Sequence, residues 1–169
     1  MDTDVLKPAR HFTAQFAPGP VVVGPVVAGI DDAATSAAEA VAGLRAAAAG
    51  PSAPRPVGAE QLLPERALDG DPLARRRLVA DGYDPLVSAG GDLIGTLTAY
   101  LEASGSIEGA ARALFVHPNT VRYRLRRVAE TTGMAPTEPR GAFALRLALA
   151  LGRLDDGAAL PAAVRPPDL

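Results

Sequence analysis

The chain has 169 residues, of which 48% are hydrophobic but only 4% aromatic, and it contains no cysteine and has a formal net charge of −2 at pH 7. This composition predicts a soluble cytoplasmic protein of one or two domains with cores of Ala, Leu and Val, and it excludes a disulfide framework and a cysteine-based zinc site. Bulk positive charge is also excluded as a means of binding nucleic acid, so such binding would need a local basic patch.

The first third of the chain predicts a small mixture of strand and helix. Residues 21–27, VVVGPVV, are typical of a short strand or strand pair interrupted by Pro25, and the alanine-rich residues 31–49 predict a helix that Gly50 ends. Residues 51–60 are proline-rich and predict an extended connection in which Val57 opens a short strand. Without further sheet partners, this strand and helix would leave apolar surface exposed.

Short helical pieces are expected next. Residues 62–68 form one piece, and Asp71 followed by Pro72 is typical of an N-cap and first helical position of another. Residues 92–103 predict a scaffold helix that ends before Gly105. Its apolar stripe consists of Leu93, Leu97, Tyr100 and Leu101.

Two helices joined by a tight turn follow from Ser106 to Gly133. Ser106 is a candidate N-cap for the first helix, and Pro118 suits the first position of the second. Phe115 stands in the turn where many helix-turn-helix motifs place glycine, which leaves the width of the turn and the crossing angle open. This segment contains five arginines and two glutamates and is therefore a local basic patch.

The second helix separates an apolar stripe from a basic face. Val121, Leu125, Val128 and Thr132 share one side and should pack on the preceding helices. The opposite face holds the candidate DNA-binding residues, with Arg124 at its flank: Asn119, Thr120, Arg122, Tyr123, Arg126 and Arg127.

These side chains suit a major-groove reader, because guanidinium groups pair with guanine edges or phosphates and Asn and Thr reach adenine or thymine edges. Asn119, Thr120, Arg122 and Tyr123 lie near the helix start and are candidates for base contacts, whereas Arg126 and Arg127 are candidates for phosphate contacts. His117 either meets a phosphate at the helix N-terminus or caps the helix. For Tyr123, packing on a neighbouring helix remains an alternative.

A last helix is expected over residues 139–154. Phe143, Leu147, Ala150, Leu151 and Leu154 share one side, which we expect to close the core. Leu145 and Leu149 widen the apolar surface and serve either the core or a dimer contact.

Other classes of function find little support. Gly90-Gly91-Asp92 resembles part of a nucleotide cyclase signature, but the following acid and aromatic residue are missing, so a loop and helix start is favoured. The two histidines, His11 and His117, are too far apart in sequence to indicate a metal centre. No apolar run of about 18 residues predicts a membrane span. We therefore expect no enzyme, no cofactor, no metal and no membrane partner.

The run AARALFVHPNTVRYRLRR, Ala110 to Arg127, together with its flanks over residues 84–154, resembles the C-terminal helix-turn-helix of the PucR/CdaR family of bacterial transcriptional regulators. The resemblance implies an effector-responsive regulator with His117, Asn119, Thr120, Arg122 and Tyr123 at the start of its recognition helix. Residues 21–68 resemble the tail of the cyclase-like regulatory domain that precedes it in this family. Relatives carry a longer N-terminal sensory region, which implies that this chain is a fragment, a truncated product or the product of a misplaced start.

The expected fold is mainly α, with a C-terminal helix-turn-helix bundle preceded by a small α+β remnant. The expected divisions are a regulatory-domain remnant over 1–58, a connecting helical segment over 59–84, a DNA-binding domain over 85–155 and a disordered tail over 156–169. The expected partner is double-stranded DNA, bound by a homodimer because one short helix contacts few base pairs, and an effector would be sensed by a missing N-terminal region. The alternatives are a protein-interaction module that pairs with a full-length regulator without binding DNA independently and, more weakly, an enzyme remnant.

Overall fold

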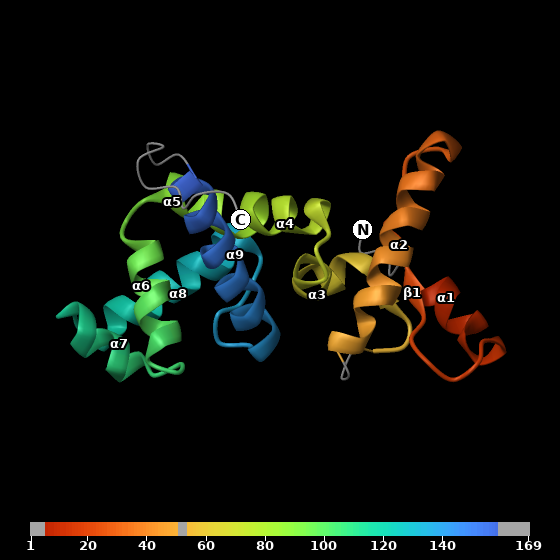
Figure 1. Ribbon diagram of the computed structural model, residues 1–169. Coiled ribbons are helices and arrows are strands. Elements are labelled where there is room, and N and C mark those ends of the chain that lie inside the picture. Colours follow the sequence, from red (N-terminus) through yellow and green to blue (C-terminus); the bar gives the residue numbers. More distant parts are fainter. Residues whose placement is uncertain (1–5, 51–53, 159–169) are drawn as a thin grey trace, which may run out of the picture. The chain divides into compact units, whose positions relative to one another are not determined.

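The computed structural model describes residues 6–50 and 54–158, and the chain divides into two compact units, Met1–Arg75 and Arg76–Leu169. Helices dominate both units, and the described residues contain one sheet of two short strands (Figure 1). The expectation of a mainly α protein is therefore confirmed.

The first unit is built around a parallel strand pair and one long helix. β1 (Val22–Val23) pairs with β2 (Val57–Gly58), with Val22 opposite Val57. The helix α2 (Ala33–Ala46) packs close to β1, since a Cβ added at Gly43 would lie 2.8 Å from Cγ1 of Val22. Ala47, Val57 and Leu62 form a small core, against which Val22 packs.

The strand and helix of this unit have the predicted types, but they are shorter than predicted. The predicted strand over residues 21–27 shortens to β1, while the predicted helix over 31–49 becomes α2 framed by the 3₁₀ turns Ile30–Asp32 and Ala47–Ala49. The 3₁₀ turn Ala59–Leu62 and α3 (Leu63–Leu68) follow β2. The unit also contains α1 (Leu6–Phe12) and the turn Thr13–Gln15, which the sequence analysis did not predict.

Arg66 of α3 is the largest buried side chain of the first unit and is held by two carboxylates. Its guanidinium lies 3.0 Å from Oε2 of Glu39 and 2.7 Å from Oδ2 of Asp71, and it also donates to the carbonyl of Ala59. Burial raises the pKa of Asp71, but hydrogen bonds from Arg66 and from the N–H groups of Ala74 and Leu73 outweigh this effect and hold the pKa below 3.8. These contacts join α2, α3 and the start of α4.

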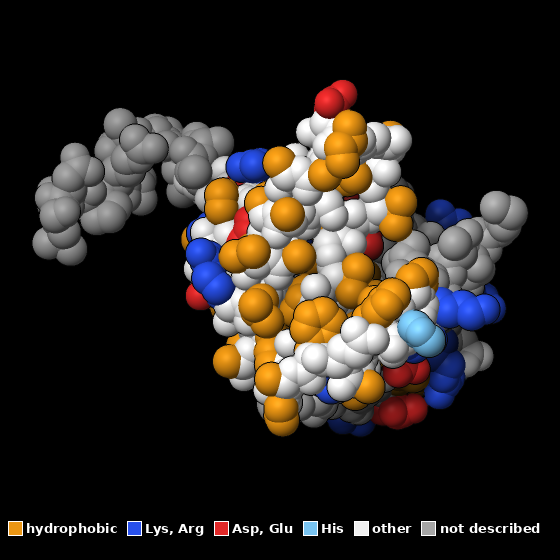
Figure 2. Space-filling model, turned by 90° about the vertical axis from the view of Figure 1, so that its right-hand side faces the viewer, with side chains coloured by type: hydrophobic (Ala, Val, Ile, Leu, Met, Phe, Trp, Pro, Cys, Tyr) orange, Lys and Arg blue, Asp and Glu red, His pale blue; other side chains and the backbone are white. Residues whose placement is uncertain are grey.

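Apolar side chains also cover part of the surface of this unit, as Figure 2 shows from its side. Val26, Ile30, Val41 and Leu44 are all exposed. The expectation that the strand and helix would leave apolar surface uncovered is therefore confirmed.

The helix α4 (Pro72–Leu78) crosses the boundary between the units. Asp71 caps it as predicted, because its Oδ1 accepts hydrogen bonds from the N–H groups of Leu73 at 2.8 Å and Ala74 at 3.2 Å. A π-helical turn, Val79–Tyr83, continues the chain into α5 (Asp84–Ala89).

The second unit contains α6 (Leu93–Glu102), α7 (Ile107–Leu114), α8 (Pro118–Thr132) and α9 (Pro139–Ala158) around one core. The predicted stripe of α6 is buried throughout. Leu97, Val121, Val128 and Leu145 lie at the centre of this core, each at 0% exposure. One aliphatic core thus supports all the helices of the predicted DNA-binding region.

The predicted core face of α9 is wrong. Leu145, Ala148, Leu149 and Gly152 are buried, whereas Leu154 is 63% exposed and Phe143 and Ala150 are also exposed. Almost every side of this helix carries alanine or leucine, so its sequence period does not identify one core face. Leu145 and Leu149 belong to the core, which was one of the two roles expected for them, the other being a dimer contact.

The end of α9 also differs from the prediction. The helix continues past Leu154 to Ala158, and Asp156 accepts a 2.5 Å hydrogen bond from the hydroxyl of Tyr83. Residues 159–169 of the predicted disordered tail lie outside the described residues.

Candidate nucleic-acid interface

The turn between α7 and α8 has the hydrogen bonds of a tight turn, although Phe115 occupies the position where many helix-turn-helix motifs have glycine. Ser106 caps α7 as predicted, since its Oγ accepts from the N–H of Gly109 at 3.0 Å. Phe115 adopts the left-handed conformation, with φ 55° and ψ 40°, and the N–H of Val116 donates to the carbonyl of Ala111 at 3.0 Å. A bulky residue thus accepts the strained backbone of the tight turn while its own side chain is 96% exposed.

His117 caps the helix α8. Its Nδ1 accepts a 3.1 Å hydrogen bond from the N–H of Asn119, and Pro118 occupies the first helical position as predicted. The capping alternative is therefore realised in this structure. His117 is also exposed at the helix N-terminus.

The two faces of α8 separate as the sequence predicts. Val121, Leu125 and Val128 are buried, and Thr132 is half-buried with its Oγ1 donating to the carbonyl of Val128. Thr120 and Arg124 are half-buried at the flanks. The remaining candidates are exposed: His117, Asn119, Arg122, Tyr123, Arg126 and Arg127.

Two candidate base-reading residues are hydrogen-bonded to each other. Arg122 donates to Oδ1 of Asn119 at 2.7 Å, and its other terminal nitrogen lies 3.4 Å from the carboxylate of Glu108 on α7. All three side chains are accessible to solvent, so these contacts exchange readily with other partners. Glu108 places a negative charge beside the basic face, which the sequence analysis counted but did not locate.

Tyr123 projects into solvent rather than into a neighbouring helix. Tyr123 is 54% exposed, and the guanidinium of Arg126 lies 5.8 Å from the centre of its ring. This cation–π distance is within the usual range, so the pair presents an aromatic ring and a positive charge together. The packing alternative for Tyr123 is not supported.

Arg124 differs from the other arginines of α8. Its guanidinium donates to Oδ2 of Asp92 at 2.9 Å and to Oγ1 of Thr96 at 3.0 Å, both on the scaffold helix side. Its side chain is 23% exposed, compared with 52% for that of Arg122. Sequence reasoning missed this pair because Asp92 lies 32 residues away and was considered only as part of a loop.

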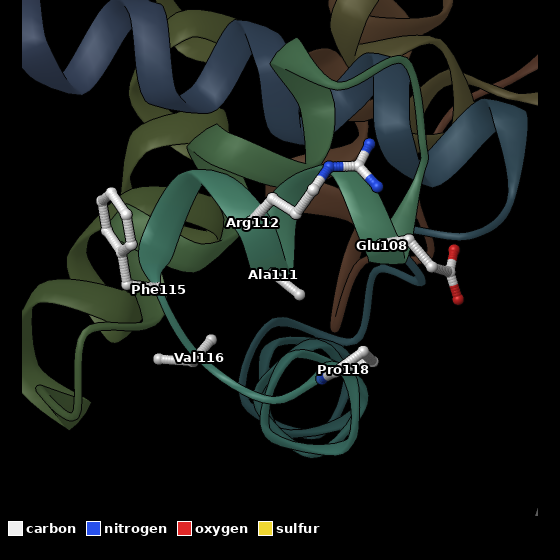
Figure 3. Close-up of a pocket in the computed structure, with 6 residues that line it drawn as sticks. All are labelled: Glu108, Ala111, Arg112, Phe115, Val116 and Pro118. Carbon is white, nitrogen blue, oxygen red and sulfur yellow. The ribbon is translucent and has the colours of Figure 1, made fainter.

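A surface hollow lies beside the turn (Figure 3). Phe115, Val116 and Ala111 contribute apolar side chains to its lining, and Glu108 and Arg112 contribute charged ones. In the close-up, Phe115 points away from the start of α8, where Pro118 lies. The lining offers no converging set of polar groups that would orient a small ligand.

Within residues 6–50 and 54–158, no cluster of metal-ligating side chains is found. In the same residues, none of the helices combines the length and apolar character needed to cross a membrane.

Known proteins share both the sequence and the fold of this region. Residues 93–151 match the family model of the PucR C-terminal helix-turn-helix domain. An uncharacterized protein of Mycobacterium tuberculosis (strain ATCC 25618 / H37Rv) is 53% identical over 154 residues, which cover 89% of this chain and 37% of that protein. The purine catabolism regulatory protein of Bacillus subtilis (strain 168) is 44% identical over 62 residues, which cover 37% of this chain and 12% of that protein.

A solved structure extends the match in three dimensions. The crystal structure of a regulator of polyketide synthase expression from Bifidobacterium adolescentis is similar with a TM-score of 0.73 and 42% identity, covering 83% of this chain and 60% of that one. The chain spans well under half the length of the curated relatives given above. The resemblance of the C-terminal region seen in the sequence is confirmed, and residues 93–151 are a helix-turn-helix domain of the PucR type, a domain of transcription regulators.

Proposed function

We propose that this chain binds double-stranded DNA in a sequence-specific manner and regulates transcription through α7 and α8. The observation that carries the proposal is the division of α8 into a buried aliphatic stripe and an exposed basic face. The stripe fixes the helix on the core of the second unit, and the basic face remains accessible to a duplex. A helix of this kind fits the major groove, where its N-terminal half reaches base edges.

The exposed side chains and the half-buried Thr120 then have distinct roles. Asn119, Thr120, Arg122 and Tyr123 read base edges, since they occupy the N-terminal half of the helix. Arg126 and Arg127 lie further along and contact phosphates. His117 contributes at the helix N-terminus, where its capping bond leaves the rest of the ring free to approach a phosphate.

The mode of action follows from the small size of this interface. One recognition helix covers only a few base pairs, so a homodimer reading a palindromic or repeated site supplies the required specificity. The protein works in the cytoplasm without a cofactor and is not an enzyme. In longer relatives, an effector sensed by a preceding region would control this step, and residues 1–58 would be the tail of that cyclase-like region.

The test is selection of bound duplexes from a random pool by the purified chain, followed by affinity measurements against salt concentration. We expect one preferred site and a logarithm of affinity that falls linearly with the logarithm of salt concentration. Recovery of no preferred sequence, combined with salt-insensitive binding, would exclude the proposed function.

A protein-interaction module is the second candidate, and α9 favours it. Leu154 and Phe143 leave part of this helix apolar and exposed. Under this alternative, duplex binding would be weak and blind to sequence, whereas a stable complex would form with a longer regulator of the same type.

A further inference from the structure

The chain adopts an unusual conformation just before the scaffold helix α6. Gly90, Gly91 and Asp92 all have positive φ, and Asp92 is a non-glycine residue at φ 55° and ψ 37°. Left-handed backbone is unfavourable for such a residue and persists only where surrounding contacts hold it. Here the carbonyl of Asp92 accepts from the N–H and the Oγ1 of Thr96 at 3.0 Å and 2.8 Å.

Gly95 makes room for the carboxylate that this conformation presents. A Cβ added at Gly95 would lie 2.2 Å from Oδ1 of Asp92, which is closer than two such atoms can approach. Glycine is otherwise unfavourable within a helix. The side chain of Asp92 therefore folds over the first turn of α6, with Oδ2 directed to Arg124.

Two oxygen atoms at the start of α6 accept hydrogen bonds from Arg124. Its terminal nitrogen bonds Oδ2 of Asp92 and Oγ1 of Thr96, and Thr96 is fully buried. Along α8, Arg124 follows Val121 by one helical turn and precedes Val128 by another, so it borders the buried stripe rather than the exposed face. A bond from this flank to α6 opposes rotation of α8 about its own axis.

We propose that Arg124 is a positioning residue that fixes the rotation of the recognition helix through Asp92 and Thr96, and that it does not contact DNA. This revises the assignment made from the sequence, where Arg124 was a candidate DNA contact. The proposal rests on the proposed function, because the purpose of the fixed rotation is to aim Asn119 and Arg122 at base edges. Asp92, Gly95 and Thr96 thereby become determinants of DNA binding although none of them lies on the basic face.

The variants Asp92→Asn and Gly95→Ala test this proposal without changing the basic face. The contacts of Arg124 with Asp92 and Thr96 are called the clamp below. Removing an acid should by simple electrostatics strengthen binding to any duplex, whereas loss of the clamp should weaken binding to the preferred one. We expect Asp92→Asn and Gly95→Ala each to lower affinity for the preferred duplex by about tenfold, the order of coupling within one hydrogen-bonded network. Affinity for random duplex should stay within about twofold of the wild-type value for both variants, except that Asp92→Asn should raise it if the lost negative charge has any effect.

Two further variants separate positioning from charge. Glu130→Gln removes an exposed acid of α8 outside the clamp and should strengthen binding slightly to all duplexes. Arg124→Gln should lower affinity for the preferred duplex but leave the salt slope unchanged, whereas loss of a phosphate contact lowers that slope by about one unit. The double variant Asp92→Asn/Arg124→Gln should lose no more affinity than Arg124→Gln alone.

Hydrogen exchange of Arg124 in the protein without DNA tests its contacts with Asp92 and Thr96 separately from DNA binding. The Nη–Hη resonances of Arg124, recorded at low temperature by nuclear magnetic resonance, should be protected from exchange in the wild type and exposed in both Asp92→Asn and Gly95→Ala, because Nη1 makes both contacts. All proteins should be confirmed as folded by circular dichroism. Failure of the wild type to select any site would overturn the proposed function but leave these resonances as evidence on the clamp. Unchanged protection of Arg124 in both variants, stronger binding by Asp92→Asn to its preferred duplex, or a lower salt slope for Arg124→Gln would overturn the clamp itself.

Discussion

Arginines on the same helix differ in what they can do, and the difference lies in what each guanidinium touches. Arg122 contacts two exposed side chains, Asn119 and Glu108, in bonds that solvent weakens. Arg127 is exposed at the far end of the basic face. Their exposure makes both available to DNA, but their positions along α8 predict different contributions to affinity.

Replacing these two arginines should therefore have different effects. Arg122→Ala should cost about 1–3 kcal/mol on the preferred duplex and relax preference at one position of the site, because a base contact is lost. Arg127→Ala should weaken all duplexes alike and lower the salt slope by about one unit, because a phosphate contact is lost. Titrations of both variants on preferred and random duplexes check this, and equal losses on both duplexes for both variants would contradict the assigned roles.

Glu108 gives a prediction of opposite sign. Its carboxylate lies 3.4 Å from Arg122 and would stand near the phosphates of a duplex bound to α8. Glu108→Gln should strengthen binding by up to about fivefold, as expected when an exposed charge pair worth up to about 1 kcal/mol no longer competes with DNA. Titration at low salt measures the effect, with Glu130→Gln as the matched exposed acid, and weaker binding by Glu108→Gln would show that this pair orients Arg122.

Among the elements, α7 and α8 could be predicted from the sequence because their signals are local. The cap at Ser106, proline at Pro118 and the period of Val121, Leu125 and Val128 all lie within the two helices that they specify. The left-handed Phe115 also agrees with its place in the turn, although the sequence left the width of that turn open.

Elements and contacts that depend on distant residues could not be predicted in the same way. The face that α9 buries packs against distant residues such as Tyr83, whose ring would lie 2.2 Å from a Cβ at Gly152. The partner of Arg124 is set by the fold of α6 on α8, and one of the two acidic partners of Arg66, Glu39, lies 27 residues away. Charge pairs across such separations leave no periodic pattern along the chain.

The corrected face of α9 can be tested by truncating one leucine on each side. Leu145 is 0% exposed and Leu154 is 63% exposed. Leu145→Ala should lower the free energy of unfolding by about 2–5 kcal/mol, because it leaves a cavity, whereas Leu154→Ala should change it by less than about 0.5 kcal/mol. Denaturant unfolding monitored by circular dichroism compares the two, and similar losses would mean that both faces are covered.

The contact between α9 and the π-helical turn gives a prediction on pH. The hydrogen bond from Tyr83 to the carboxylate of Asp156, together with burial of the ring, raises the pKa of Tyr83 above 10.0. A raised pKa means that this contribution to stability is fully present below the unfolded pKa of about 10 and is lost as pH rises through and beyond it.

The change to make is Tyr83→Phe. In the wild type, the free energy of unfolding should fall as pH rises through and beyond about 10, and this fall should be smaller in Tyr83→Phe because the titrating hydroxyl is gone. Unfolding curves across this range measure both proteins, with Tyr123→Phe as the control for an exposed tyrosine. An equal fall in Tyr83→Phe would show that other groups cause the pH dependence.

At the scale of the whole molecule, the two units have separate cores and separate stabilising contacts. Ala47, Val57 and Leu62 belong to the first unit, and the aliphatic core beneath α8 belongs to the second. All three tyrosines, Tyr83, Tyr100 and Tyr123, also lie in the second unit. Tyrosine fluorescence therefore reports on the second unit, while circular dichroism reports on the helices of both.

Arg66→Ala should uncouple these two signals. The substitution leaves Glu39 and Asp71 without the guanidinium that they share, and loss of one partner of a buried ion pair costs about 3–5 kcal/mol. We expect the first unit to unfold at lower denaturant, so that part of the helical signal is lost before the tyrosine transition, which should keep its wild-type midpoint. DNA affinity should also remain at the wild-type value, since the basic face belongs to the second unit, and a tyrosine transition that shifted together with the helical one would show that the units fold as one.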